Sequence, residues 1–228
     1  MAAAPTEVQY KITDSITANP TCTFTSAQTA GNMNLLLAQW SVGDPPTSVT
    51  DSKGNQYTLV IVHARSDQPN TGEALFYCPS IVAATAGSNT VTCHSDSTDI
   101  EIVIIEIHGG VAIDGAVIID QTINTTTCTG STTLHYPNEL AYAYESDVSA
   151  PGDAAGPGWN QHAGFPANFQ SILESQTFAS AGSISATVTM ASGMQGGTFL
   201  IFGITNTPLV STLPTGTSGL LTRSAYFI

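Results

Sequence analysis

Basic residues are almost missing from this chain. Only four Lys and Arg residues stand against seventeen Asp and Glu among 228 residues, and the formal net charge is −13. An acidic surface of this kind repels nucleic-acid phosphates and anionic lipid headgroups. We therefore expect neither a nucleic-acid partner nor membrane insertion.

Long apolar runs and a recognisable leader are also missing. The most apolar stretch, residues 100–107, contains two glutamates and has the length of a strand rather than of a membrane span. Residues 1–7 have no basic n-region and no apolar core, unlike a signal or transit peptide. We expect a soluble protein that either lost a leader before this start or never passed through a secretion channel.

Paired metal-ligand spacings are a third absence. The four cysteines, Cys22, Cys78, Cys93 and Cys128, form no Cys-x-x-Cys pair, which argues against structural zinc. Cys78 and Cys93 flank a turn sequence at 85–88 almost symmetrically, so a hairpin there would set them opposite each other. A Cys78–Cys93 disulfide and buried free thiols are the two alternatives.

Thr, Ser, Gly, Ala and Val are abundant, and they are the material of strands and turns. Period-two alternation marks a series of short strands, and helical periodicity is nearly absent. We predict an all-β fold, a single antiparallel β-sandwich that is jelly-roll-like and has about ten strands. The expected strands are 8–13, 21–25, 33–42, 57–65, 74–78, 89–94, 100–108, 117–122, 139–144, 183–190 and 198–204. The sandwich should span 1–204, with an extended C-terminal tail at 205–228.

The clearest turn is the segment Asp51-Ser52-Lys53-Gly54-Asn55. An Asp can accept hydrogen bonds from the backbone that follows it, and Gly and Asn tolerate positive φ. A calcium loop would need several oxygen ligands and a distal glutamate, whereas this segment has one carboxylate. We therefore expect a structural turn.

Residues 145–169 form a predicted long connection rich in Gly and Pro. Connections of this length are usually functional or disordered. Trp159, His162 and Phe165 lie in it, and such groups suit a ligand platform or a subunit contact. The alternative is that they pack onto the end of the sandwich.

The predicted tail is polar and interrupted by proline before a group of apolar residues that the sandwich does not need. As a docking strand it could pair with an open edge of a neighbouring molecule and bury these side chains. The alternative is docking onto its own domain. The expected contact residues are Leu220, Leu221, Tyr226, Phe227 and Ile228.

The segment Thr-Asp-Ser-Lys-Gly-Asn-Gln-Tyr-Thr at 50–58 is the best of a series of short motifs along this chain. The order of these motifs resembles a family of β-sandwich surface domains of bacterial extracellular proteins and of phage or metagenomic open reading frames. The resemblance implies a sandwich without catalytic residues, used as a surface or adhesion module or as an accessory part of a particle. The matching segments are 29–37, 48–58, 76–79, 86–92, 106–110, 137–140 and 180–187.

An acid–base enzyme first requires two carboxylates that lie close together. We expect no such pair from this sequence. Glu101 and Glu106 differ in parity on one predicted strand, so they should point to opposite faces. Glu139 and Glu145 share a face but should lie roughly 20 Å apart, beyond the roughly 5–9.5 Å that glycosidases use.

Nucleophile and metal motifs are missing as well. The chain has no Gly-x-Ser-x-Gly, no Walker-type loop and no His-Glu-x-x-His, and its histidines at 63, 94, 108, 135 and 162 stand alone. Four acids around one strand pair could hold calcium between loops, although solvated acidic rims are commoner. These acids are Asp96, Asp99, Asp114 and Asp120.

Together these observations predict a non-enzymatic structural protein without a cofactor. We expect a phage virion accessory or decoration protein or an extracellular filament subunit, which would bind copies of itself or other structural proteins. The alternative is a secreted or surface-exposed module that binds a glycan or a host surface through the loop aromatics. Its location would be the virion or the cell exterior.

Overall fold

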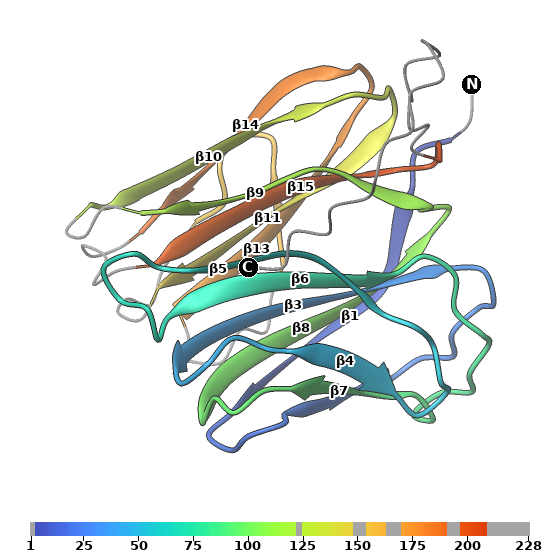
Figure 1. Ribbon diagram of the computed structural model, residues 1–228. Coiled ribbons are helices and arrows are strands. Elements are labelled where there is room, and N and C mark those ends of the chain that lie inside the picture. The colour runs from blue at the N-terminus through green and yellow to red at the C-terminus, as the bar shows by residue number, and fades with distance from the viewer. Residues whose placement is uncertain (1–2, 122–124, 148–153, 163–169, 191–196, 209–228) are drawn as a thin grey trace, which may run out of the picture.

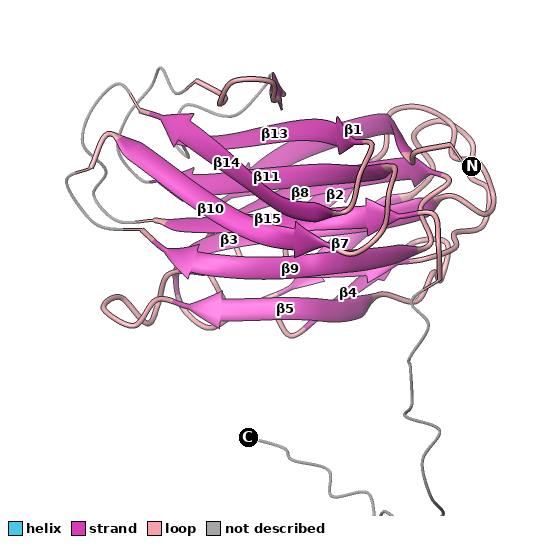
Figure 2. Ribbon diagram, turned by 90° about the horizontal axis from the view of Figure 1, so that it is seen from above, coloured by secondary structure: helices cyan, strands magenta, loops and turns pink. Residues whose placement is uncertain are grey.

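The computed structural model describes residues 3–121, 125–147, 154–162, 170–190 and 197–208. This described part consists of strands and loops and contains no helix (Figures 1 and 2). Its fifteen strands form four antiparallel sheets. The prediction of an all-β antiparallel sandwich is therefore confirmed.

The N-terminal half of the chain supplies two of the sheets. The N-terminal large sheet has the order β1 (Thr6–Ser15), β8 (Asp99–His108), β3 (Met33–Val42), β6 (Gly72–Cys78) and β5 (Thr58–Ala64). The N-terminal small sheet has the order β2 (Thr21–Thr23), β7 (Thr90–His94) and β4 (Ser48–Asp51).

The C-terminal half supplies the other two sheets. The C-terminal large sheet has the order β12 (Asn160–Gln161), β13 (Gln170–Phe178), β11 (Glu139–Asp147), β15 (Thr198–Thr205) and β9 (Ala112–Asp120). The C-terminal small sheet pairs β10 (Thr127–Leu134) with β14 (Gly182–Thr189).

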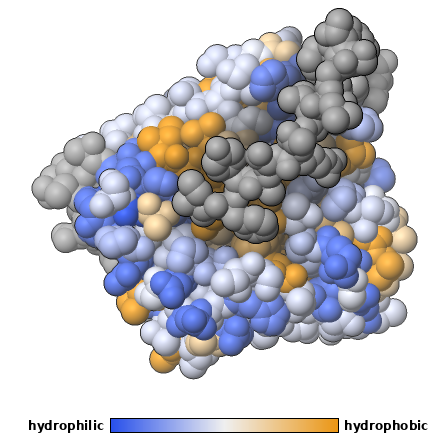
Figure 3. All heavy atoms as spheres, viewed as in Figure 1, coloured by the Kyte–Doolittle hydropathy of each residue, from blue (hydrophilic) through white to orange (hydrophobic). Residues whose placement is uncertain are grey.

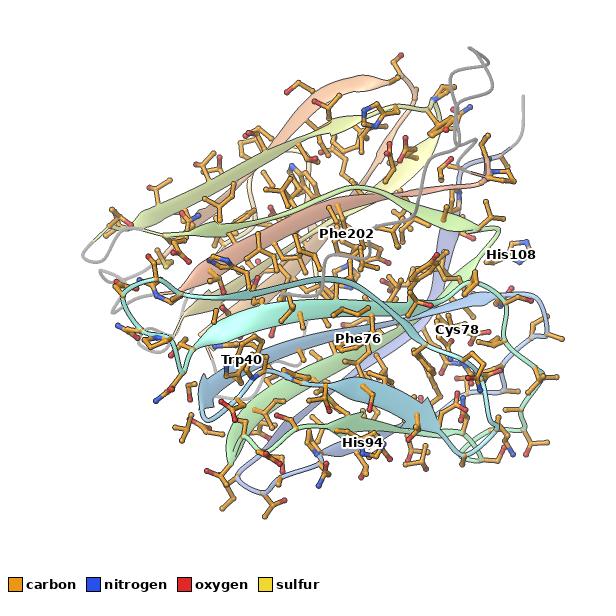
Figure 4. All side chains as sticks on the ribbon, viewed as in Figure 1. Trp40, Phe76, Cys78, His94, His108 and Phe202 are labelled. Carbon is orange, nitrogen blue, oxygen red and sulfur yellow. The ribbon has the colours of Figure 1, made fainter. Side chains whose placement is uncertain are left out.

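The four sheets lie one above another, with the two large sheets face to face in the middle (Figure 1). The large sheets are apolar on both faces, so each also needs a cover on its outer face. In β3, for example, Leu35 and Leu37 pack between the large sheets, whereas Trp40 packs under the N-terminal small sheet. Figure 4 shows the same division for Phe202 in the middle layer and Phe76 outside it. A third core lies between the C-terminal large and small sheets.

The two halves repeat one strand order. Read from β1, the N-terminal large sheet contains the first, eighth, third, sixth and fifth strands of its half. Read from β9, the C-terminal large sheet has the corresponding order, β9, β15, β11, β13 and β12. The position of β4 in the C-terminal half is held by a single bridge between Ala154 and Thr189. The molecule is thus built from two topologically equivalent units joined through their large sheets.

Arg65 ties the large sheets together along one side. Its buried guanidinium donates to the backbone carbonyls of Gly197 and Gln121 and pairs with Asp67 at 2.8 Å. Nearby, His63 Nε2 lies 2.8 Å from the carboxylate of Asp120. One of the few cations of the chain is therefore used inside the fold.

Most expected strands are present, and β3 has the predicted bounds. The strands that the sequence did not indicate are β4, β10, β12 and β13. The predicted connection at 145–169 is wrong in two places, because 145–147 continue β11 and Asn160–Gln161 form β12. β10 was missed because its alternation uses Thr, Ser and Gly instead of large apolar residues.

The four cysteines are free and buried, so the expected disulfide between Cys78 and Cys93 is not formed and the thiol alternative holds. The two residues do not face each other across a hairpin. Cys78 ends β6 in the large sheet opposite Asn34, while Cys93 lies in the small sheet opposite Val49. Burial also raises the pKa of Cys93 to about 12, which keeps this sulfur a thiol.

Replacing Arg65 tests its role as a tie between the sheets. Arg65→Met keeps the aliphatic volume but leaves the carbonyl acceptors without their donor, so unfolding should become easier by about 2–3 kcal/mol. Urea denaturation measures this loss. Asp67→Ala is the control, because Asp67 is 54% exposed and its loss leaves the hydrogen bonds from Arg65 to the Gly197 and Gln121 carbonyls in place, so this variant should lose less stability. Equal losses for both variants would refute the role.

Candidate functional site

The motif at 50–58 folds into a hydrogen-bond hub around Asp51. One oxygen of this carboxylate accepts from the backbone amides of Lys53 and Asn55, at 3.1 and 3.0 Å. The other accepts from the side chains of Asn55, Tyr57 and Asn89, at 2.7, 3.2 and 3.1 Å. The predicted structural turn is present, and its carboxylate is committed to the turn and to β-strand neighbours.

The hub extends through buried amides to distant segments. Asn89 donates to Gln28, Gln28 donates to Asn34, and Asn34 donates to Tyr57, at 2.7, 2.8 and 3.0 Å. Asn34, Tyr57 and Asn89 belong to three of the segments that carry the family resemblance, and Gln28 directly precedes one of them. Their shared task is to hold one end of the N-terminal half together.

Glu106 forms a second hub at the same end. Its carboxylate accepts from the Asn32 and Gln9 side chains, both at 2.7 Å, and from the Thr29 amide at 3.0 Å. Asn32 also contacts His108 at 3.1 Å (Figure 4 labels His108). The carboxylates of Asp51 and Glu106 thus serve to hold the fold together at this end.

Glutamate is an interior residue in this protein. The chain has seven glutamates, and all except Glu7 are fully buried. Buried carboxylic acids need hydrogen bonds or neutralisation to offset the loss of water. The buried six are Glu73, Glu101, Glu106, Glu139, Glu145 and Glu174.

Two of them lie in a polar row between the large sheets. Gln39 in β3 is paired with Glu73 on one side and Glu101 on the other, so the three form a line across the sheet. A row of hydroxyls on the C-terminal large sheet faces this line, namely Ser171, Ser146 and Thr198.

Hydrogen bonds join the two rows. The Ser171 hydroxyl donates to Gln39 at 2.8 Å, and the Tyr144 hydroxyl donates to Glu101 at 2.5 Å. Burial raises the pKa of Glu73 to about 8, with hydroxyls of Ser146 and Thr198 opposing the rise. Burial likewise raises the pKa of Glu101 to about 7. The row is an internal, largely protonated polar contact between the two halves.

The outer face of the C-terminal large sheet holds a second pair of acids. Asp114 accepts from the backbone amide and the ring of His135, at 2.6 and 2.8 Å. Burial raises the pKa of the neighbouring Glu139 to about 7, and the Asp114 carboxylate adds to this rise. Glu139 is fully buried, so this acid pair is not exposed for contact with a substrate from solvent.

The carboxylate pairs considered from the sequence do not converge. Glu101 points between the large sheets and Glu106 points to the opposite face, as the parity argument predicted. Glu139 and Glu145 lie near opposite ends of β11, opposite Phe178 and Ile172 of β13. In neither pair are the two carboxylates placed to act on the same substrate bond.

Of the four acids considered for calcium, all except the exposed Asp96 have separate partners. Asp99 accepts from Ser41, Asp114 from His135, and Asp120 from Ser66 and the ring of His63. Among the residues described, no group of three or more His, Cys, Asp or Glu is placed to hold a metal ion.

Trp159 lies inside the third core. Its side chain is 8% exposed, its indole nitrogen donates to the Ser185 carbonyl at 3.3 Å, and its ring makes an edge contact with Phe178. This placement corresponds to packing onto the sandwich, not to an open ligand platform. Phe165 lies outside the described residues.

His162 closes the edge between β1 and β12. Its Nε2 lies 3.0 Å from the Ser175 hydroxyl and its Nδ1 lies 3.7 Å from the Glu7 carboxylate. The order Ser–His–Glu resembles a hydrolase triad, but 3.7 Å exceeds a hydrogen bond and Ser175 is a buried mid-strand residue. Tyr10 packs edge-on against the ring, and burial lowers the pKa of His162. We interpret these contacts as a structural link between β1 and the C-terminal large sheet.

The opposite edge of the sandwich lies between β5 and β9. Along most of its described length it has no comparable polar contact between the large sheets. Apolar side chains of β5, β6 and β9 are only half-buried where the large sheets meet there. We call these residues the seam: Val60, Ile61, Tyr77, Ala116 and Ile118. Figure 3 shows hydrophobic side chains gathered over β9 on this face. No pattern in the sequence indicates the seam directly, because the seam depends on which strands lie at the sheet edges.

The expected contact residues of the tail, Leu220, Leu221, Tyr226, Phe227 and Ile228, lie outside the described residues. The described chain leaves β15 at Thr205, which is paired with Ala112 at the start of β9. The tail therefore begins beside one end of the β9 strand.

No family model, curated protein or solved structure matches this chain. Over the described ranges, no helix is long and apolar enough to cross a membrane.

The raised glutamate pKa values predict an unusual pH profile. A carboxyl whose pKa is raised by folding stabilises the native state below its unfolded pKa, and this contribution is lost as pH rises through the folded value. Stability should therefore fall between pH 4.5 and 8, by up to about 1.4 kcal/mol per pH unit for each such group. Urea midpoints across this range measure the slope.

The double variant Glu73→Gln, Glu101→Gln should make that profile less steep, because the two neutral amides cannot titrate whereas Glu139 and Glu174 still do. Asp67→Asn, at an exposed position, serves as the control and should leave the slope unchanged. A wild-type stability that rises toward pH 8 would contradict the assignment.

Trp159→Ala should destabilise the protein by about 3–5 kcal/mol, because it empties a large site in the third core. Trp159→Phe keeps most of the packing and should cost less. Thermal or urea unfolding measures both. If Trp159→Ala left the stability unchanged, the core placement of Trp159 would be contradicted and a surface platform would be favoured.

Proposed function

We propose that this protein is a non-enzymatic structural component of a larger assembly. A phage virion accessory or decoration protein is the leading form of the proposal, and an extracellular filament subunit is the second. The partners would be copies of the same chain or other structural proteins, and the location would be the virion or the cell exterior.

The observation that carries the proposal is the seam. The carboxyl groups of Asp51, Glu73, Glu101 and Glu106 are buried or bonded within the fold. The strand edges beside the seam carry hydrophobic side chains and no Lys, the residue that commonly protects an edge. Such edges suit a molecule whose neighbours cover them.

The strand order supports the finer, jelly-roll proposal. A jelly roll winds eight strands into facing sheets of the order 1-8-3-6 and 2-7-4-5. The N-terminal half has β1-β8-β3-β6 and β2-β7-β4, and differs in that β5 pairs with β6. Jelly rolls recur in viral capsids and in lectins, which is an argument by analogy.

The native mass of the particle tests the proposal. Gel filtration with light scattering should show defined multimers for the full chain and monomers after removal of 206–228. Circular dichroism of the deleted chain should remain that of a β-protein, since β15 ends at Thr205. Compact monomers for both chains would contradict the proposal and would favour an autonomous glycan-binding module.

A further inference from the structure

We propose that the seam and the free edge of β9 accept residues 220–228 from a second copy of the chain as an added strand. This inference rests on the proposed assembly function and names its connector. It combines three properties: an open apolar edge, a complementary charge, and a linker of suitable length.

The β9 edge is able to receive a strand. β9 pairs with β15 on one side, and no described strand pairs with its other side. Its register is regular from Val117 to Asp120, after a bulge between Asp114 and Val117. An added strand here would bond to free backbone groups and cover the half-buried Ala116 and Ile118.

The charge of the donor segment fits the acceptor. Residues 175–228 contain no Asp or Glu, and Arg223 is their only charged side chain. At the far end of β9, the side chains of Asp120 and Asp67 are 31% and 54% exposed. Hydrogen bonds from His63 and Ser66 lower the pKa of Asp120 although burial opposes them. A single cation in an apolar segment therefore meets ionised carboxylates at the seam.

The linker is long enough to reach a second copy. Thr205 leaves the sheet beside Ala112, and the free edge of β9 in the same molecule is only about 10 Å away, two strand spacings. Residues 206–219 provide fourteen positions, including Pro208 and Pro214, and an extended chain of this length spans up to about 50 Å. The linker thus permits donation to a neighbouring molecule, and docking on the same molecule is the alternative that the experiments below distinguish.

Two full-length variants separate acceptor from donor. Ile118→Lys blocks the seam, and Phe227→Asp removes an apolar group from the donor and adds a charge. Each variant alone should run at the monomer mass by light scattering. Their 1:1 mixture should form dimers and nothing larger, because one intact edge and one intact tail remain. Val62→Lys, on the outward face of β5 at a residue 39% exposed, should assemble like the wild type.

Hydrogen exchange on the unmodified chain gives a readout that does not depend on the variants folding. Among residues 116–120, the amides that do not bond to β15 should be protected in concentrated samples and lose about tenfold or more of that protection after dilution to the monomer. Concentration-independent protection would mean that the tail docks on its own molecule, and it would overturn the second-copy assignment. Multimers that persist in Ile118→Lys would refute the seam as acceptor while leaving the assembly function intact. A full chain that is monomeric at every concentration would refute both.

Discussion

The need to cover both faces of two apolar sheets governs this structure. Strands such as β3 and β8 are buried along nearly their whole length, so a simple two-layer sandwich would leave one face of each large sheet in water. The small sheets supply the missing covers, and the result is four layers with three cores. With the faces covered, apolar side chains of the large sheets remain half-buried at strand edges such as the seam. The seam is therefore a product of the architecture.

Burial of carboxyl groups is the second organising feature, and it changes how the charge of the chain should be understood. The formal charge of −13 counts every acid as ionised. Glu73 and Glu101 sit between the large sheets with pKa values near 8 and 7, so they add less negative charge at neutral pH than composition suggests. Some of the carboxyl groups that the composition suggests for the surface are therefore in the interior.

The fold class could be predicted because alternation and β-branched residues act locally. β3 and β15 were recognisable from their own residues, and so was the turn at Asp51. Pairing between distant strands is not a local property, which is why the Cys78–Cys93 hairpin was wrong. β13 escaped prediction because Glu174 and its serines look like surface residues, yet the sheet buries them. The seam could not be predicted for the same reason, since it exists only after the edges are assigned.

The repeated strand order has a consequence for how molecules of this chain can associate. Each half presents its large sheet to the other, and only residues 109–111 separate β8 from β9. Gly109 in this connection has a φ of 77°, a conformation that suits a sharp reversal. If this hinge straightens, the second half of one molecule can pack on the first half of another through the same contacts. Such domain swapping would create dimers without any new interface, and the interior of a single molecule would become the contact between two.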